Sequence, residues 1–227
     1  MKIETLDHVA LWVRDRDALA GFLTRHLGMH VIDRADRFTL VGSDARRGKL
    51  TLFAAEGEGE REPGALVRVA FRVRDLESAL ARLPADLPVE RRGAGALFAG
   101  PEGLGLGLLE AEGVEYDIDH VTLRVPDPAR TYRELLRFGF EDEGGRLGAG
   151  GSYVELEAGG SGETARPLLN HLGLRVGSAA EHLAEAESLG LEIADVVDAA
   201  NTFAVFVWGP ERIKLEYVEH KPTFSLV

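Results

Sequence analysis

Four stretches of the chain resemble one another in the order of their apolar and polar residues. They are residues 6–15, 66–75, 118–127 and 169–178. In each stretch apolar residues alternate with others, which is the period of a half-buried β-strand. Each ends at Asp or Ser, residues that favour the start of a helix, and apolar residues at helical spacing follow. Short β-like runs between Gly- and Asp-rich turns then complete a β-α-β-β-β unit.

The third residue of each stretch marks the repeat: His8, Arg68, His120 and His171. Consecutive markers lie 60, 52 and 51 residues apart, so one module of about 50 residues occurs four times. We therefore expect an α+β fold of four βαβββ modules paired into two domains, each a curved mixed sheet with its helices outside. Residues 1–112 would form the N-terminal pair of modules and residues 113–227 the C-terminal pair.

Composition and charge narrow the range of partners. The chain has 227 residues, which suits two domains of about 110. It carries 38 acidic against 26 basic residues, and a formal charge of −12 argues against nucleic acid as a partner. No apolar run approaches the ~20 residues of a membrane helix, and residues 1–10 lack the apolar centre of a signal peptide. We expect a cytoplasmic protein with no membrane partner, whose strand edges are compatible with a homodimer.

The chain contains no cysteine, which excludes thiolate metal sites and a cysteine nucleophile. A metal would have to be held by histidines and carboxylates. Strand alternation places His120 and His171 opposite the apolar faces of their strands, and Glu216 opposite the apolar face of the last strand. Two histidines and one carboxylate on one concave surface are the composition of the 2-His-1-carboxylate triad, which leaves metal positions open for substrate, water or O₂.

The N-terminal half differs at these positions. His8 occupies the first ligand position, but Arg68 occupies the second, and an arginine side chain is permanently charged and a poor ligand for a cation. The position that matches Glu216 is Gly107. We therefore expect residues 1–112 to be a metal-free scaffold in which His8 is a remnant.

Modules that open with Asp-His-Val and close with Gly-Pro-x-x-x-x-x-Glu resemble the vicinal oxygen chelate superfamily, which includes glyoxalase I, bleomycin resistance proteins and extradiol dioxygenases. The resemblance covers almost the whole chain and is greatest to type I extradiol dioxygenases. It implies a metal-dependent, ring-cleaving dioxygenase that takes O₂ and a small aromatic or keto-acid substrate with two adjacent oxygens. It also implies a divalent metal held by His120, His171 and Glu216. Fe(II) is expected, with Mn(II), Zn(II) or Ni(II) as alternatives.

The residues that handle protons in those dioxygenases are replaced here. Tyr153 stands where the family has an acid–base histidine, and Phe206 where it has a tyrosine. Tyrosine is a poor base near neutral pH, so we expect Tyr153 to donate a hydrogen bond and Phe206 to contact the substrate. Arg124 and Arg175 lie about 13 Å along their strands from the predicted ligand histidines, where they would bind an anionic substituent or pair with acidic residues at the sheet edge.

Two other functions stay open. A glyoxalase-like lyase or isomerase would normally need a fourth protein ligand or a second carboxylate base. A metal-free drug- or metabolite-binding protein of the bleomycin-resistance type would explain the missing proton-handling residues directly. Residues 217–227 would close over the site or pack as an ordinary tail, with His220 in solvent.

Overall fold

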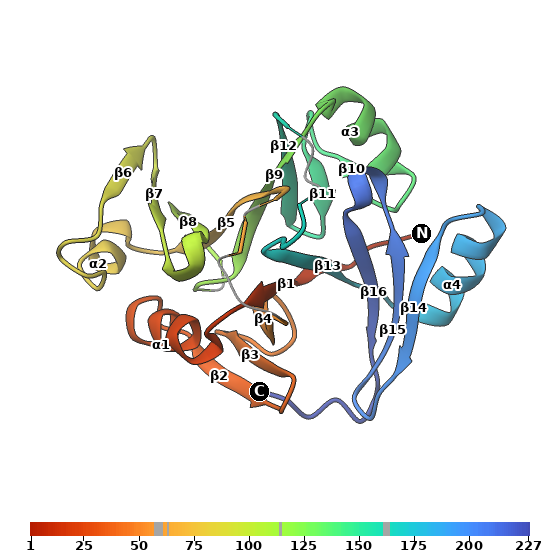
Figure 1. Ribbon diagram of the computed structural model, residues 1–227, viewed down its shortest axis with the longest axis horizontal. Coiled ribbons are helices and arrows are strands. Elements are labelled where there is room, and N and C mark those ends of the chain that lie inside the picture. Colours follow the sequence, from red (N-terminus) through yellow and green to blue (C-terminus); the bar gives the residue numbers. More distant parts are fainter. Residues whose placement is uncertain (57–60, 63, 114, 161–163) are drawn as a thin grey trace.

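The computed structural model describes residues 1–56, 61–62, 64–113, 115–160 and 164–227. In this part of the chain the strands form two mixed sheets of eight strands each, with four α-helices outside them (Figure 1). The predicted α+β fold of four βαβββ modules in two domains is therefore confirmed.

The first sheet has the strand order β14-β15-β16-β13-β1-β4-β3-β2. Its strands come from the two ends of the chain: β1 Thr5–Val13, β2 His30–Arg34, β3 Phe38–Gly42, β4 Lys49–Ala54, β13 Leu169–Arg175, β14 Ile193–Asp198, β15 Thr202–Trp208 and β16 Lys214–His220. The second sheet has the order β10-β11-β12-β9-β5-β8-β7-β6. Its strands come from the middle of the chain: β5 Leu66–Val73, β6 Val89–Arg92, β7 Gly95–Ala99, β8 Gly105–Glu110, β9 Ile118–Val125, β10 Glu141–Asp142, β11 Leu147–Ala149 and β12 Ser152–Ala158.

The modules pair differently from the expected division at residue 112. Strand β1 of the first module pairs antiparallel with β13 of the fourth, and β5 of the second pairs antiparallel with β9 of the third. Each sheet thus combines one module from each half of the chain. The opening strand of every module has a free hydrogen-bonding edge that another opening strand can pair with. Apolar periodicity predicts such strands but does not determine which two of them meet.

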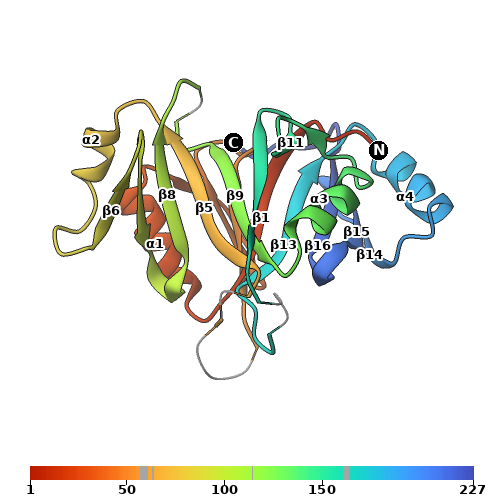
Figure 2. The same ribbon diagram turned by 90° about the horizontal axis from the view of Figure 1, so that it is seen from above.

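The helices begin where their capping residues predict. They are α1 Arg16–His26, α2 Leu76–Leu80, α3 Pro128–Leu136 and α4 Ala179–Ser188, with short 3₁₀ turns η1 Pro101–Gly103 and η2 Pro210–Arg212. The side chains of the four caps each accept a hydrogen bond from a backbone amide three residues on: Asp15, Asp75, Asp127 and Ser178. Helices α2 and α4 lie at opposite ends of the molecule in both views (Figure 2).

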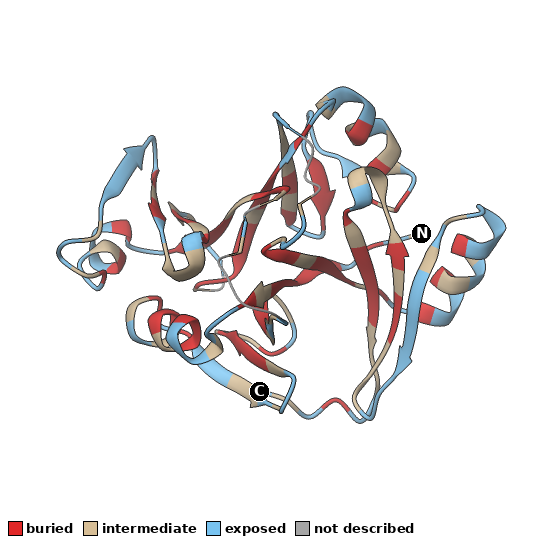
Figure 3. Ribbon diagram, viewed as in Figure 1, coloured by how far each residue is buried: buried red, intermediate tan, exposed pale blue. Residues whose placement is uncertain are grey.

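Apolar residues of both sheets belong to one core. The central strands are the most buried, whereas the edge strands β2, β6 and β14 are largely exposed (Figure 3). Tyr217 of β16 is fully buried, and its hydroxyl donates a 2.8 Å hydrogen bond to the carbonyl oxygen of Phe138, just after α3. This bond ties the first sheet to the third module. Among the described residues, no helix has the length and apolar character needed to cross a membrane.

We expect Tyr217→Phe to lower the free energy of unfolding by about 1–3 kcal/mol, because it leaves a buried carbonyl without its donor. Tyr132→Phe is the matched control, since the Tyr132 hydroxyl donates to Asp142 over 2.6 Å in a hydrogen bond that is exposed to solvent. The control should change stability by no more than about 0.5 kcal/mol. Urea denaturation of both variants measures the difference, and equal losses would contradict the bridging role of Tyr217.

Candidate metal centre

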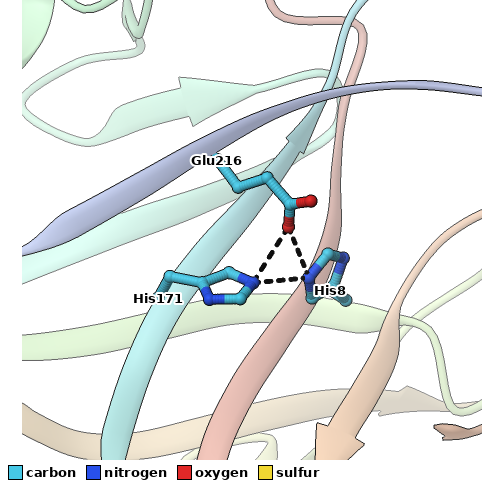
Figure 4. Close-up of side chains that lie close together, drawn as sticks. All are labelled: His8, His171 and Glu216. Atoms are coloured by element: carbon cyan, nitrogen blue, oxygen red, sulfur yellow. Dashed lines mark hydrogen bonds and ion pairs between the residues drawn. The ribbon is translucent and has the colours of Figure 1, made fainter. Parts of the chain in front are cut away.

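Three potential metal ligands lie together in the first sheet: His8 on β1, His171 on β13 and Glu216 on β16 (Figure 4). All three are buried, with exposures of 7%, 3% and 7%. The two Nε2 atoms lie 3.0 Å apart, and each lies 2.9 Å from Oε2 of Glu216. Three donor atoms therefore converge on one point of the sheet.

A β-bulge orients His8 toward this point. In the β1–β13 ladder Leu6 pairs with Leu174 and His8 with Gly173, so Asp7 is an extra residue. The carboxylate of Asp7 lies 2.8 Å from Nδ1 of His8 and accepts a hydrogen bond from it. With a proton held at Nδ1, Nε2 is the atom left to bind a metal.

The same arrangement recurs on β13. Ala10 pairs with His171 and Leu11 with Leu169, which makes Asn170 the extra residue. The side-chain oxygen of Asn170 lies 3.0 Å from Nδ1 of His171. Both ligand histidines are thus preceded by a bulged residue whose side chain holds the far nitrogen of the ring.

Gly173 makes room for the His8 ring. It lies directly across the ladder from His8. A Cβ added at residue 173 would lie 2.2 Å from Cε1 and 2.3 Å from Nδ1 of His8, well inside van der Waals contact. Any other residue at this position would displace the ring.

Burial disfavours each charge in the cluster, and the neighbouring groups decide which residues stay ionised. For His8 the burial is outweighed by Glu216 and Asp7, which raise the pKa of the ring to about 9. Burial, together with the charge of His8, lowers the pKa of His171. Glu216 is buried as well, but His8 and His171 hold the pKa of its carboxyl well below its usual range. Without a metal, a protonated His8 therefore pairs with the Glu216 carboxylate beside a neutral His171.

The cluster fits a divalent cation. Its donor atoms lie 2.9–3.0 Å from one another. Adjacent ligands of an octahedral ion have this separation when each bond is about 2.1 Å long. Two imidazoles and one carboxylate suit Fe(II), Mn(II) or Zn(II).

Among the residues that the structure describes, no carboxylate occupies the fourth corner of the cluster. Gly173, two residues after His171, faces Glu216 in the β13–β16 ladder. The equivalent residue after His8 is Ala10, which faces Thr51 in the β1–β4 ladder. Thr51 therefore occupies in the first module the position that Glu216 occupies in the fourth.

His120 does not join the cluster, because β9 lies in the second sheet between β5 and β12. Its Nδ1 lies 2.8 Å from Oδ2 of Asp119, and its Nε2 lies 3.9 Å from Oε2 of Glu155. Its ring stacks on Tyr153, with centroids 5.0 Å apart. Burial, with Asp119 as the next cause, raises the pKa of Tyr153 to about 12. Tyr153 therefore stays protonated, in the sheet that does not hold the cluster.

The strand pairing explains why His8 takes the expected place of His120. Alternation predicts the face that a side chain occupies, but not which strand lies next to it. The neighbour of β13 is β1 rather than β9. The structure therefore places His8, instead of the expected His120, beside His171 and Glu216, so that a residue of the segment 1–112 belongs to the cluster. The signal that could have found His8 is its Asp-His pair, which matches residues 119–120.

The two arginines pair with acidic residues instead of facing the cluster. Nε of Arg124 donates to Glu157 over 2.9 Å in the second sheet, and Nε of Arg175 donates to Glu4 over 3.1 Å at the end of β13. Of the two roles expected for them, the structure supports ion pairing. Phe206 on β15 does reach the cluster, since its ring meets that of His171 edge-on at 5.1 Å.

A second group of buried charges adjoins His8. Nζ of Lys49 donates to Oδ2 of Asp7 over 2.6 Å, and Nε2 of His220 lies 3.2 Å from Oδ1 of Asp7. Burial opposes the charge of Asp7, but Lys49, His220 and His8 together hold its pKa well below the usual range. His220 is therefore not in solvent as expected: its side chain is 8% exposed. Nothing in the spacing of the sequence predicts this contact.

The C-terminal tail covers one side of this group. It runs from β16 toward β2 (Figure 1), where Nε2 of His30 lies 3.1 Å from the carbonyl oxygen of Val227. On the way, the ring of Phe224 stacks on that of His220 with centroids 4.0 Å apart. Of the two roles expected for the tail, this placement favours closure over the site.

Two cavities meet at the cluster. One, of about 340 Å³, is lined by His8, Lys49, Thr51 and His220 and by Phe224 of the tail. The other, of about 820 Å³, extends along β15 and β16 toward Trp12 and Trp208. Their shared wall consists of His171, Glu216 and three phenylalanines: Phe38, Phe53 and Phe206. A ligand at the cluster would thus have a polar side and an aromatic side.

Residues 5–98 match the family model described as the Glyoxalase/Bleomycin resistance protein/Dioxygenase superfamily. The predicted resemblance to this superfamily is confirmed. The matched segment includes β1, and with it Asp7 and His8. No curated protein is similar to the chain in sequence at a significant level.

Solved structures of the superfamily's fold overlay most of the chain. A provisionally named dioxygenase from Bacillus subtilis subsp. subtilis str. 168 is 18% identical, with a TM-score of 0.76 over 98% of this chain and 87% of that one. Glyoxalase I from Zea mays is 17% identical, with a TM-score of 0.72 over 95% and 92%. The cppA protein from Streptococcus pneumoniae TIGR4 is 14% identical, with a TM-score of 0.65 over 96% and 100%. At these identities the likeness shows a shared fold, and the activity has to be argued from the site.

The metal-free protein should lose stability as the pH rises from 7 to 9.5. The pKa of His8 is about 9 in the folded chain and about 6.5 when unfolded, so its contribution is complete below pH ~6.5 and is lost as the pH passes 9. We expect a loss on the order of 2–3 kcal/mol from this group. Urea denaturation in the presence of a chelator measures it. His8→Gln should flatten the profile in this range, and an unchanged slope in that variant would rule out His8 as its source.

Gly173→Ala should weaken binding of a divalent cation by about 10–100-fold, because the added methyl group pushes the His8 ring away from the other ligands. Gly177→Ala is the matched control, since a Cβ there meets only Oε1 of Glu4 at 3.3 Å. Isothermal titration of the two chelator-treated variants with Zn²⁺ gives the comparison. Equal affinities would contradict the steric role of Gly173.

Proposed function

We propose that the protein is a metal-dependent dioxygenase of the extradiol type, acting on a small substrate with two adjacent oxygens. The observation that carries this proposal is the cluster of His8, His171 and Glu216, with donor atoms about 3 Å apart on the wall of an aromatic-lined cleft. A site with three protein ligands leaves room for both substrate oxygens and for O₂.

Each part of the site has a task in this proposal. The chemistry supplied by a bound divalent ion is chelation of the two substrate oxygens and, for Fe(II) or Mn(II), activation of O₂. Asp7 and Asn170 hold the two imidazoles through Nδ1, so that both rings keep their orientation. Phe53 and Phe206 stand on either side of the His171 ring, at 6.2 and 5.1 Å, and form flat apolar walls for a substrate ring.

His220 is our candidate for proton transfer, the task that the sequence left without a residue. It lines the same cavity as His8 and Glu216. Its Nδ1 is buried and has no hydrogen-bond partner within the described part of the chain, while its Nε2 faces Asp7 at 3.2 Å. A histidine held by a carboxylate on one nitrogen can accept a proton on the other. The tail residue Phe224 packs on the ring and limits its exchange with solvent.

Thr51 weighs against a glyoxalase-like lyase or isomerase. Such an enzyme would need a fourth ligand or a carboxylate base at the corner opposite Glu216, where a threonine hydroxyl stands. The metal-free binding protein is the alternative with its own support, because His8, His171 and Glu216 satisfy one another without an ion. Metal analysis separates it from the dioxygenase.

The chain purified without oxygen and loaded with Fe(II) should hold one iron per chain and consume O₂ in the presence of catechols. His8→Ala should reduce iron affinity at least about 100-fold, because it removes one of three ligands. His120→Ala is the matched control: it removes a histidine that also follows a bulged aspartate, but in the other sheet. It should leave iron binding unchanged.

Iron content by mass spectrometry and O₂ uptake with an electrode measure these expectations. If His120→Ala loses iron while His8→Ala retains it, the metal site lies in the second sheet and not in the first. Tight Zn²⁺ or Ni²⁺ binding without O₂ uptake would favour the lyase. If the wild-type protein binds no divalent cation, both enzyme functions are excluded and the metal-free binding protein is the remaining function.

A further inference from the structure

The larger cavity holds an unusual share of the aromatic residues of the chain. Five rings line it, including both tryptophans of the sequence: Trp12, Phe38, Phe53, Phe206 and Trp208. Ring centroids lie 5.5 Å apart between Trp12 and Phe53 and 6.0 Å apart between Phe38 and Phe53. These rings suit a flat apolar ligand body that extends from the cluster.

Lys214 brings a positive charge into this aromatic wall. Its ammonium lies 5.5 Å from the ring centre of Trp208 and 5.9 Å from that of Phe206. Within the described residues it has neither a hydrogen bond nor an ion pair, although 38 acidic residues are present in the chain. The residue is partly buried.

The other charged groups of the cavity do not neutralise this ammonium directly. Asp36, Arg37, Asp195 and Glu216 also line the wall, and among the described residues none of these carboxylates forms an ion pair with Lys214. Oδ1 of Asp195 accepts a 2.8 Å hydrogen bond from the backbone of Val196, and Oε2 of Glu216 lies 2.9 Å from Nε2 of both His8 and His171. A partly buried lysine among aromatic rings thus lacks the close anion that usually accompanies such a group.

Asn170 adds a neutral donor to the same wall. It lines the larger cavity, and its side-chain oxygen is engaged with Nδ1 of His171. When that oxygen accepts a hydrogen bond from the N–H group of the imidazole, both hydrogens of the Asn170 amide remain available to a ligand. A cation and an amide N–H₂ group are together a suitable set of partners for a carboxylate.

The distance between Lys214 and the cluster indicates how long a ligand that contacts both would be. Lys214 and Glu216 lie two residues apart on β16 and share one face of the sheet. Two residues of extended chain span about 6.6 Å, which is close to the length of an aromatic ring with its substituents. A ligand held at the cluster by one end would therefore bring a substituent on its far side to the ammonium.

We propose that the larger cavity binds an aromatic ligand carrying an anionic group, with Lys214 as the charge partner of that group. The role that the sequence suggested for Arg124 and Arg175 would then belong to Lys214. That this ligand is the substrate rests on the proposed function; the pairing of the anion with Lys214 does not require a metal.

Benzoate and the neutral benzyl alcohol are the probes, titrated into chelator-treated protein while tryptophan fluorescence is recorded. Both tryptophans line this cavity and an adjoining one of about 530 Å³ that also includes Lys214, so the signal reports binding beside Lys214 without any turnover. Benzoate should bind at least about tenfold more tightly than benzyl alcohol, and Lys214→Met should remove this difference. Lys214→Arg, which keeps the charge, should retain most of it.

Arg212→Met is the matched control, because that guanidinium lies 4.1 Å from the ring centre of Trp208 but already pairs with Glu192 over 2.7 Å. It should leave the preference for benzoate unchanged. Equal affinity of the two probes in wild type, or a preference that survives Lys214→Met, would overturn the inference.

The two proposals fail separately. Benzoate selectivity through Lys214 in a chain that holds no iron would support this inference and refute the dioxygenase. Stoichiometric iron and O₂ uptake without benzoate selectivity would do the reverse.

Discussion

The antiparallel pairing of β1 with β13 is the contact on which the site depends. It joins the first module to the fourth and brings Nε2 of His8 within 3.0 Å of Nε2 of His171. The same ladder creates the two bulges that turn Asp7 and Asn170 toward those rings. Had β1 paired with β5 in the same register, the neighbour of His8 would have been Arg68 in place of His171, and an arginine is a poor ligand for a cation. One choice of strand partner therefore decides whether the sheet can hold a cation.

Much of the fold follows from local rules. The repeat of about 50 residues predicts four modules, and the helix caps at Asp15, Asp75, Asp127 and Ser178 lie where the strands end. Alternation also predicts that His171 and Glu216 share one face. None of these rules contains information on which opening strands meet, because all of them have similar edges. His120 was expected in the site for that reason, and Lys49 and His220 could not be expected at all, since their contacts with Asp7 depend on the same pairing.

The second sheet repeats the design of the site in part. Asp119 is the bulged residue of β9, and it holds Nδ1 of His120 as Asp7 holds that of His8. Glu155 faces Thr122, two residues after His120, which is the register of Glu216. The opposite module contributes Arg68 and Gly107, so the four positions equivalent to those of the first sheet hold one histidine and one carboxylate. An Asp-His pair in this fold therefore indicates a histidine whose ring is held in place by the preceding aspartate. A complete set of metal ligands also requires that two modules with a histidine at this position pair with each other.

The chain order of the two sheets bears on how the protein is made. The inner modules are neighbours in sequence, so their sheet can assemble from contiguous chain, whereas β1 must wait for β13 and β16 to leave the ribosome. During that interval a buried, apolar strand has no partner on one edge, which is a hazard for aggregation. Glu216 also comes later in the chain than His8 and His171. Capture of an ion by all three residues would thus have to follow synthesis of β16, and an ion held there would link β1 to β16.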